Sequence, residues 1–179
     1  MTWTSFHRRG DVLRDVIAAA DARRDGVLPS DVDGVAATFT DDLDLLATLQ
    51  LKWHTRLAGR IEREQLTQPM DLRASVVRAW HATADELPGI RAVLDEARLR
   101  PADDETAEIM RKSAAKEHVL LAVMAGAASA HDERAATVGS RIEAEAKATW
   151  PPYAGLDGLD PDHSGRPSFL DRLKAALAA

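Results

Sequence analysis

The chain has 179 residues, carries 29 acidic against 23 basic side chains for a net charge of −6, and contains no cysteine. This length suits one domain with a core large enough to fold without cross-links. The composition excludes disulfides, thiolate metal sites and cysteine catalysis, and the acidic balance argues against nucleic-acid binding, where a basic face supplies most of the affinity.

Charged residues interrupt the long apolar segments of the chain. At its start, Arg8, Arg9 and Asp11 break up any run long enough for a signal peptide. The longest uncharged apolar stretch, residues 119–130, is too short to cross a bilayer. We therefore expect a cytoplasmic protein without membrane association. The excess of arginine over lysine, together with abundant alanine, indicates a GC-rich bacterial genome.

Apolar residues recur with the helical period along almost the whole sequence, and strand-like alternation is almost absent. The sequence thus predicts an all-α fold, a helical bundle of about five or six main helices. Thr40 is the expected N-cap of a helix over residues 40–64, because acidic residues follow it at the positive end of the helix dipole. The expected helices cover residues 5–24, a short segment after Ser30, 40–64, 71–87, 104–130 and 133–149. Residues 88–101 either continue the helix over 71–87 or form a separate short helix.

The composition changes after the last of these helices, where two successive prolines cannot continue the helical backbone. We expect a bundle domain over residues 1–150, a linker rich in Pro, Gly and Asp over 151–167, and a short amphipathic helix over 168–179. A helix that short is marginal alone, so it should dock on the bundle or on a partner.

Part of this tail, residues 160–171, resembles a calcium-binding EF-hand loop at a few ligand positions. Pro167 removes an amide inside the loop, and no helix is expected to lead into it. A turn-rich linker explains the same residues, and we prefer that interpretation.

The expected helix over residues 104–130 differs from the others in its second half. From Val119 to Ala130 it is apolar or small on all sides, and a helix without a polar face is normally enclosed. It is therefore either the central helix of the bundle or a helix whose burial is completed by a second copy. We expect a homo-oligomer formed through this segment.

Two Trp-His pairs, Trp53-His54 and Trp80-His81, lie on successive expected helices. His54 falls within the apolar stripe of its helix, whereas His81 lies at the edge of its stripe, four residues before Asp85. The preferred interpretation is that the tryptophans pack in the core, that His54 hydrogen-bonds to a neighbouring helix, and that His81 hydrogen-bonds to Asp85 on the helix surface.

A different interpretation combines residues from two helices. If these helices face each other, His54, Glu117 and His118 would form an acid–base or metal-binding cluster, with His81 and Asp85 as a supporting pair. The spacing argues against a metal centre, because neither Glu-x-x-His nor His-x-x-x-His occurs. We expect no metal and no cofactor, and the sequence leaves open whether the protein is an enzyme.

Four basic residues recur at helical spacing along the second long helix, and we call them the basic ridge: Lys52, Arg56, Arg60 and Arg63. Most such ridges are solvated faces, here partly neutralised by Glu64 four residues after Arg60. The functional alternative is a contact with an anion or with an acidic partner.

These patterns favour a helical-bundle protein that interacts with other proteins or regulates them and that self-associates. The alternative is a helical-bundle enzyme or metal-binding protein that uses the His/Glu cluster between helices. The two differ in whether His54, Glu117 and His118 converge on a cavity that a substrate can reach.

Overall fold

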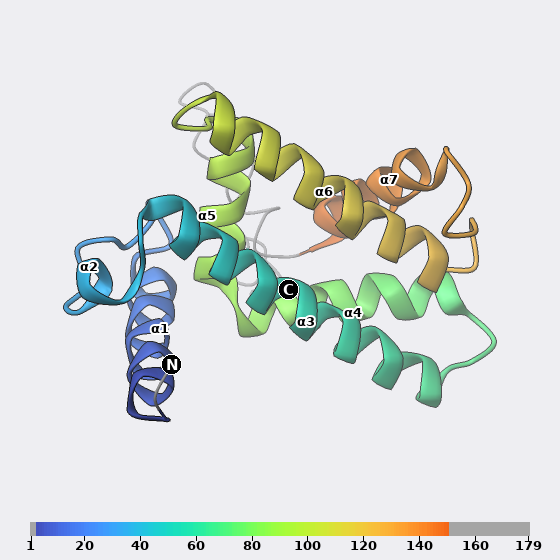
Figure 1. Cartoon of the computed structure of the whole chain (residues 1–179). Helices are drawn as coiled ribbons and strands as arrows, with labels where there is room; N and C mark the ends of the chain where they lie inside the picture. Colours follow the sequence, from blue (N-terminus) through green and yellow to red (C-terminus); the bar gives the residue numbers. More distant parts are fainter. Residues whose placement is uncertain (1–2, 151–179) are drawn as a thin grey trace, which may run out of the picture. The chain divides into compact units, whose positions relative to one another are not determined.

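The computed structural model describes residues 3–150, with side chains from Arg8 onward. Every regular element in this range is a helix, which confirms the all-α bundle. The chain divides into two compact units, residues 1–146 and 147–179. The expected linker, C-terminal helix and EF-hand-like loop lie outside the described residues. The helices (Figure 1) are α1 Trp3–Arg23, α2 Val35–Thr38, α3 Asp42–Thr67, α4 Leu72–Glu86, α5 Pro88–Leu99, α6 Asp104–Met124 and α7 Ala135–Thr149.

Aspartate side chains begin three of these helices. Asp41, Asp71 and Asp103 each accept a hydrogen bond from the backbone N–H three residues further on, at 2.7–3.0 Å. Such a cap satisfies one of the free amides in the first turn. The expected cap at Thr40 is therefore wrong by one residue. The segment after α4 is a separate helix, since Leu87 ends α4 and Pro88 begins α5.

Helix α6 ends at Met124, six residues before the expected end at Ala130. Gly126 adopts a left-handed φ of 65°, which glycine tolerates without the strain of a Cβ. The Gly126 amide bonds to the Val123 carbonyl and the next amide bonds to the Ala122 carbonyl, the pair that terminates a helix in a Schellman motif. The prediction of a helix through Ala130 was wrong because this glycine is a stop signal.

The core of the first unit is centred on the antiparallel pair α3 and α4, which lie side by side (Figure 1). Trp53 and Trp80 are fully buried there and meet edge to face, with ring centroids 5.8 Å apart. This arrangement confirms that both tryptophans pack in the core. It also brings the polar groups on the adjacent turns of α3 close to α5 and α6.

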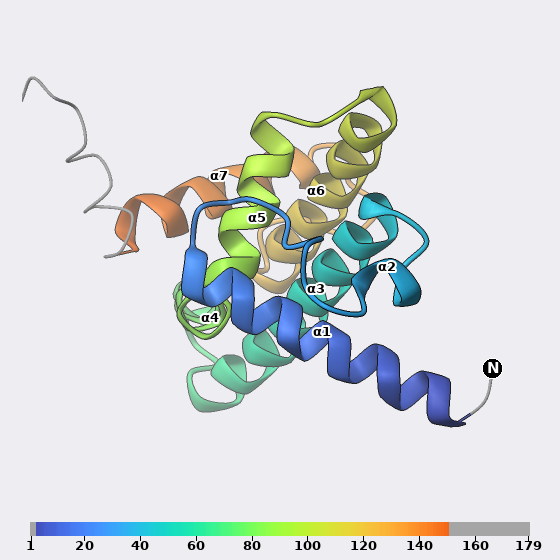
Figure 2. The ribbon, with the colours of Figure 1, turned by 90° about the vertical axis from the view of Figure 1, so that its left-hand side faces the viewer.

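Helix α1 runs past the start of α5 (Figure 2). The contact is made by backbone: a Cβ added at Gly89 would lie 2.2 Å from the Ala20 carbonyl carbon and 2.3 Å from the Asp21 amide nitrogen. The Asp21 carboxylate accepts the Gly89 N–H at 2.8 Å, so α1 supplies a cap for α5. Glycine is required here because no side chain fits between the two helices.

Arg9 of α1 ties that helix to the beginning of α3. Its guanidinium donates to the Asp44 carboxylate at 2.8 Å and to the Thr38 carbonyl at 3.1 Å, and it lies over the Phe39 ring. The hydrogen bond from Arg9 holds the pKa of Asp44 below its ordinary value of 3.8, because it stabilises the charged carboxylate.

This shift predicts part of the acid sensitivity of the fold. A carboxyl whose pKa is lowered by folding stabilises the protein above its unfolded pKa, and that contribution disappears as the pH falls through the folded pKa. Asp44→Asn should therefore reduce the loss of thermal stability between pH 7 and pH 3, measured as Tm. Asp33→Asn, at an exposed carboxyl outside the described ion pairs, is the control and should leave the loss unchanged.

Among the described residues, no helix is long and apolar enough to cross a membrane.

Candidate functional site

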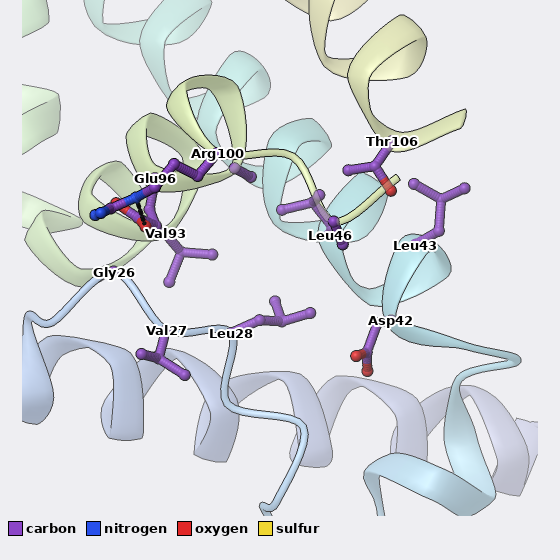
Figure 3. Close-up of a pocket in the computed structure, with 12 residues that line it drawn as sticks. Gly26, Val27, Leu28, Asp42, Leu43, Leu46, Val93, Glu96, Arg100 and Thr106 are labelled. Carbon is purple, nitrogen blue, oxygen red and sulfur yellow. Dashed lines mark hydrogen bonds and ion pairs between the residues drawn. The ribbon is translucent and has the colours of Figure 1, made fainter. Parts of the chain in front are cut away.

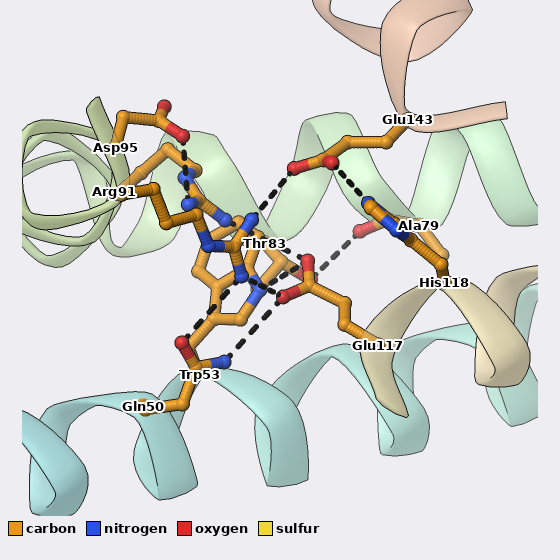
Figure 4. A network of polar contacts seen from close by, with 10 residues as sticks. Gln50, Trp53, Ala79, Thr83, Arg91, Asp95, Glu117, His118 and Glu143 are labelled. Atoms are coloured by element: carbon orange, nitrogen blue, oxygen red, sulfur yellow. Dashed lines mark hydrogen bonds and ion pairs between the residues drawn. The ribbon is translucent and has the colours of Figure 1, made fainter. Parts of the chain in front are cut away.

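Charged side chains from α5, α6 and α7 meet beside the tryptophan core, where α3 adds an amide and an indole (Figure 4). We call this group the ion-pair network. All of its ion pairs are partly or fully shielded from solvent, which strengthens each interaction compared with the surface. Its members are Gln50, Trp53, Arg91, Asp95, Arg98, Glu117, His118 and Glu143.

Glu117 of α6 is the centre of the network and is 0 % exposed. Its carboxylate accepts from Arg98 at 2.6 Å and from the indole N–H of Trp53 at 2.9 Å, while Arg91 lies 3.6 Å away. The side-chain amide of Gln50 donates at 3.4 Å to Glu117 Oε2, the oxygen that Arg98 also contacts. A buried carboxylate is tolerated only when its charge and its lone pairs find partners, and Glu117 has both.

Arg91 of α5 is also fully buried and lies over the Trp53 ring, 4.7 Å from the centroid. Burial alone would lower its pKa, but the neighbouring carboxylates of Asp95, Glu117 and Glu143 outweigh that effect and raise the pKa above its ordinary value. The guanidinium therefore stays charged and holds α5 against α3 and α6.

Helix α7 supplies Glu143, which joins the second arginine to a histidine. Glu143 contacts Arg98 at 3.1 Å and the Nε2 atom of His118 at 2.7 Å. A Cβ at Gly139, one turn earlier, would lie 1.7 Å from the His118 carbonyl oxygen, so this glycine allows α7 to approach α6 closely. That close approach is what places Glu143 within reach of both partners.

The two histidines of the Trp-His pairs do not enter this network. His54 is half-buried, not enclosed as its position in the apolar stripe predicted, and it lines a surface hollow of about 230 Å³ with Leu51, Ser113 and Lys116. His81 hydrogen-bonds through Nε2 to the Ala146 carbonyl at 2.8 Å. The sequence predicted Asp85 as the partner of His81, and the hydrogen bond that the structure shows here runs to the backbone of α7.

The structure brings together only part of the His/Glu cluster. Glu117 and His118 reach the network from adjacent positions of α6, whereas His54 lies in the hollow described above, with Gln50 bordering both places. Among the described residues, no group of three or more histidine and carboxylate side chains is placed to hold a metal ion. The contacts of Glu117 are those of a group that joins helices.

The basic ridge of α3 is only partly paired. Arg56 and Arg60 share one carboxylate, that of Glu86 on α4, at 2.5 and 2.7 Å. The expected partner Glu64 instead contacts Arg78. Three ridge residues, Lys52, Arg56 and Arg63, line a shallow hollow of about 200 Å³ together with Thr55 and Gly59. We call it the basic hollow.

A third hollow, of about 240 Å³, lies between the loop after α1 and helices α3, α5 and α6 (Figure 3). Leu28, Leu43, Leu46 and Val93 give it an apolar lining, and Arg100 at its rim is paired with Glu96. Neither Glu117 nor His118 lines any of these three hollows. A substrate bound in one of them would therefore not contact Glu117 or His118, and in the His54 hollow it would meet the network only at Gln50.

Comparison of the chain with models of protein families, with functionally described proteins and with solved structures finds no match. The fold and the site define the class of the molecule: an all-α bundle built around buried ion pairs.

The sequence interpretation missed Arg91 and Arg98, the two cations of the network. They lie seven residues apart, among the buried Ile90, Val93 and Leu94 of α5. That spacing places both guanidinium groups on one face of the helix, next to the apolar stripe. Two arginines at heptad spacing beside an apolar stripe are the signal that could have indicated a buried ionic site.

Proposed function

We propose that this protein acts by binding other proteins, in the cytoplasm, and that it self-associates in that role. The observation that carries the proposal is an apolar end of the bundle, formed by Leu66, Met70 and Leu72 together with the turn over residues 125–130. Leu66 is 84 % and Met70 is 95 % exposed. Exposed apolar side chains that gather in one place are typical of interaction surfaces.

The two segments of the apolar end lie side by side (Figure 1). Gln65 donates to the Met124 carbonyl at 2.6 Å, and a Cβ at Gly126 would lie 3.3 Å from the Leu72 methyl group. The segment over residues 119–130 was expected to form the contact between copies. Within the monomer Leu121 and Ala122 are already buried, so the contact would use its end and the neighbouring α3–α4 turn.

The charge distribution supports a second copy as the occupant of this surface. A two-fold interface brings the same patch of both copies together, so a patch with one dominant charge would repel itself. Residues 65–70 and 119–130 carry no charge, and Asp71 and Arg73, which flank Leu72, carry one charge of each sign. The chain as a whole has a net charge of −6 and repels its copies elsewhere. The apolar end is therefore compatible with itself.

Sedimentation equilibrium tests the proposal. The wild-type protein should have twice the mass of one chain at tens of micromolar. Leu66→Glu combined with Met70→Glu should weaken dimerisation at least about 100-fold, because the interface would then enclose unpaired charges. Both side chains are exposed, so the far-ultraviolet circular dichroism of the monomer should not change.

The control is Leu99→Glu, which alters a leucine that is 75 % exposed at the end of α5. It should leave the dimer intact. A wild-type protein that is monomeric at these concentrations, or a double variant that still dimerises, would contradict the proposal.

A further inference from the structure

Gly59 lies in the middle of the 26-residue helix α3, where the fold gives no reason for a glycine. Its side-chain position faces open space, since a Cβ added there would meet nothing within 4 Å. Glycine is the poorest helix residue after proline, so most other residues would suit the isolated bundle better. A glycine at such a place leaves the helix backbone open to close approach by another molecule, and the charges around it distinguish Gly59 from other open glycines.

The basic side chains around Gly59 also have too few acidic partners within the described residues to balance their charge. Lys52 and Arg63 are exposed and have no acidic partner there, and Arg56 and Arg60 share the single carboxylate of Glu86. Exposed Glu62 offsets one positive charge, which leaves an excess of two on this face of α3. An excess of positive charge on a chain with a net charge of −6 favours an acidic ligand.

The spacing of the cations sets the size of that ligand. Lys52 and Arg63 lie eleven residues apart, which corresponds to about 16 Å along the helix axis. A single phosphate or carboxylate is too small to neutralise both. A nucleic acid is long enough, but the acidic remainder of the protein would repel it. A second helix laid along α3 has the required length, and the absent side chain at Gly59 lets its backbone come close.

We infer that the basic hollow on α3 binds an acidic helix of a different protein. The partner helix crosses α3 at Gly59 and presents two acidic side chains, about three turns apart, to Lys52 and Arg63. Thr55 and Arg56 line the same hollow and would lie beside the partner helix. This surface shares no residue with the apolar end proposed for self-association, but Arg63 lies one helical turn from Leu66 on α3. The two inferences are therefore separated with a substitution at Met70.

Photo-crosslinking of the full-length protein in the cells that make it tests the inference. We would place p-benzoylphenylalanine at exposed position 62, three residues from Gly59, and, as a control, at exposed position 141 on α7. Position 62 should give a discrete adduct with another protein, and position 141 should not. Mass spectrometry of the adduct should identify a helical segment with at least two acidic residues.

Substitutions in the hollow give the specific readout. Gly59→Leu fills the hollow and should reduce the yield of the adduct at least tenfold, as should Lys52→Glu combined with Arg63→Glu. Gly10→Leu is the matched control, because Gly10 is also an exposed helix glycine with nothing within 4 Å of its added Cβ. It should leave the yield unchanged, and circular dichroism should show every variant folded.

Four results would overturn the inference: no adduct at position 62, an adduct with nucleic acid or lipid, an adduct with a second copy of this chain, or a yield that Gly59→Leu and Gly10→Leu change equally. The adduct should persist in the Met70→Glu variant, because that substitution alters the apolar end and adds no charge to α3.

Discussion

Gly89→Ala should lower the free energy of unfolding by about 3 kcal/mol or more. The added Cβ would lie 2.2–2.4 Å from backbone atoms of Ala20 and Asp21. Backbone atoms cannot rotate away as a flexible side chain does, so α1 and α5 would have to separate. Separation would also break the hydrogen bond from the Gly89 amide to the Asp21 carboxylate.

Urea denaturation measures this effect. With a slope of about 2 kcal/mol per molar urea, the midpoint should fall by about 1.5 M. Gly59→Ala is the matched control, since its Cβ meets nothing and alanine favours a helix by up to about 1 kcal/mol relative to glycine. Equal stability of Gly89→Ala and the wild type would mean that α1 and α5 do not pack backbone to backbone.

The helices were predictable because their signals are local. Periodic apolar residues fix the existence of a helix, and acidic residues at its start mark the cap, as Asp71 shows for α4. The predicted helix boundaries were wrong where two local sequence signals competed. Gly126 lies inside the segment expected to be helical through residue 130, whereas its left-handed φ ends α6. For residues 88–101 the sequence left open a continuation of the preceding helix or a separate helix; the structure shows a separate helix in which Gly89 makes a tertiary contact.

The ion-pair network was only partly predictable because its members lie on four helices. Helical periodicity places a residue on a face, but it does not say which face of another helix lies opposite. Glu117 and His118 were found as chemically capable residues, yet their partners Arg91 and Arg98 were not. His54 shows the opposite error: its place in the stripe predicted burial, whereas the structure leaves it half-exposed beside a hollow.

Glu117→Ala should destabilise the fold by about 3–5 kcal/mol, because it removes one member of a buried ion-pair network and leaves the others in place. Arg91 would remain fully buried with Asp95 as its nearest carboxylate, and the indole N–H of Trp53 would lose its acceptor. Glu117→Gln keeps the shape and an acceptor oxygen but removes the charge, so its loss of stability should be about half as large. Urea denaturation at pH 7 measures both.

The control on the same helix is Glu108→Ala, which removes exposed ion pairs with Arg111 and Lys112 and should change stability little. A Glu117→Gln variant as stable as the wild type would show that the charge of Glu117 contributes nothing, and that its hydrogen bonds alone join the helices.

A double-mutant cycle separates the charge interaction from packing. Glu117→Met leaves Arg91 without a carboxylate that it contacts at 3.6 Å, and Arg91→Met removes the buried cation that Glu117 faces. Breaking a buried pair costs more than replacing both partners by apolar groups of similar size. The double variant should therefore be more stable than the sum of the two single losses predicts, by about 1–3 kcal/mol. Strict additivity would mean that Arg98, which lies 2.6 Å from Glu117, carries the electrostatic contribution alone.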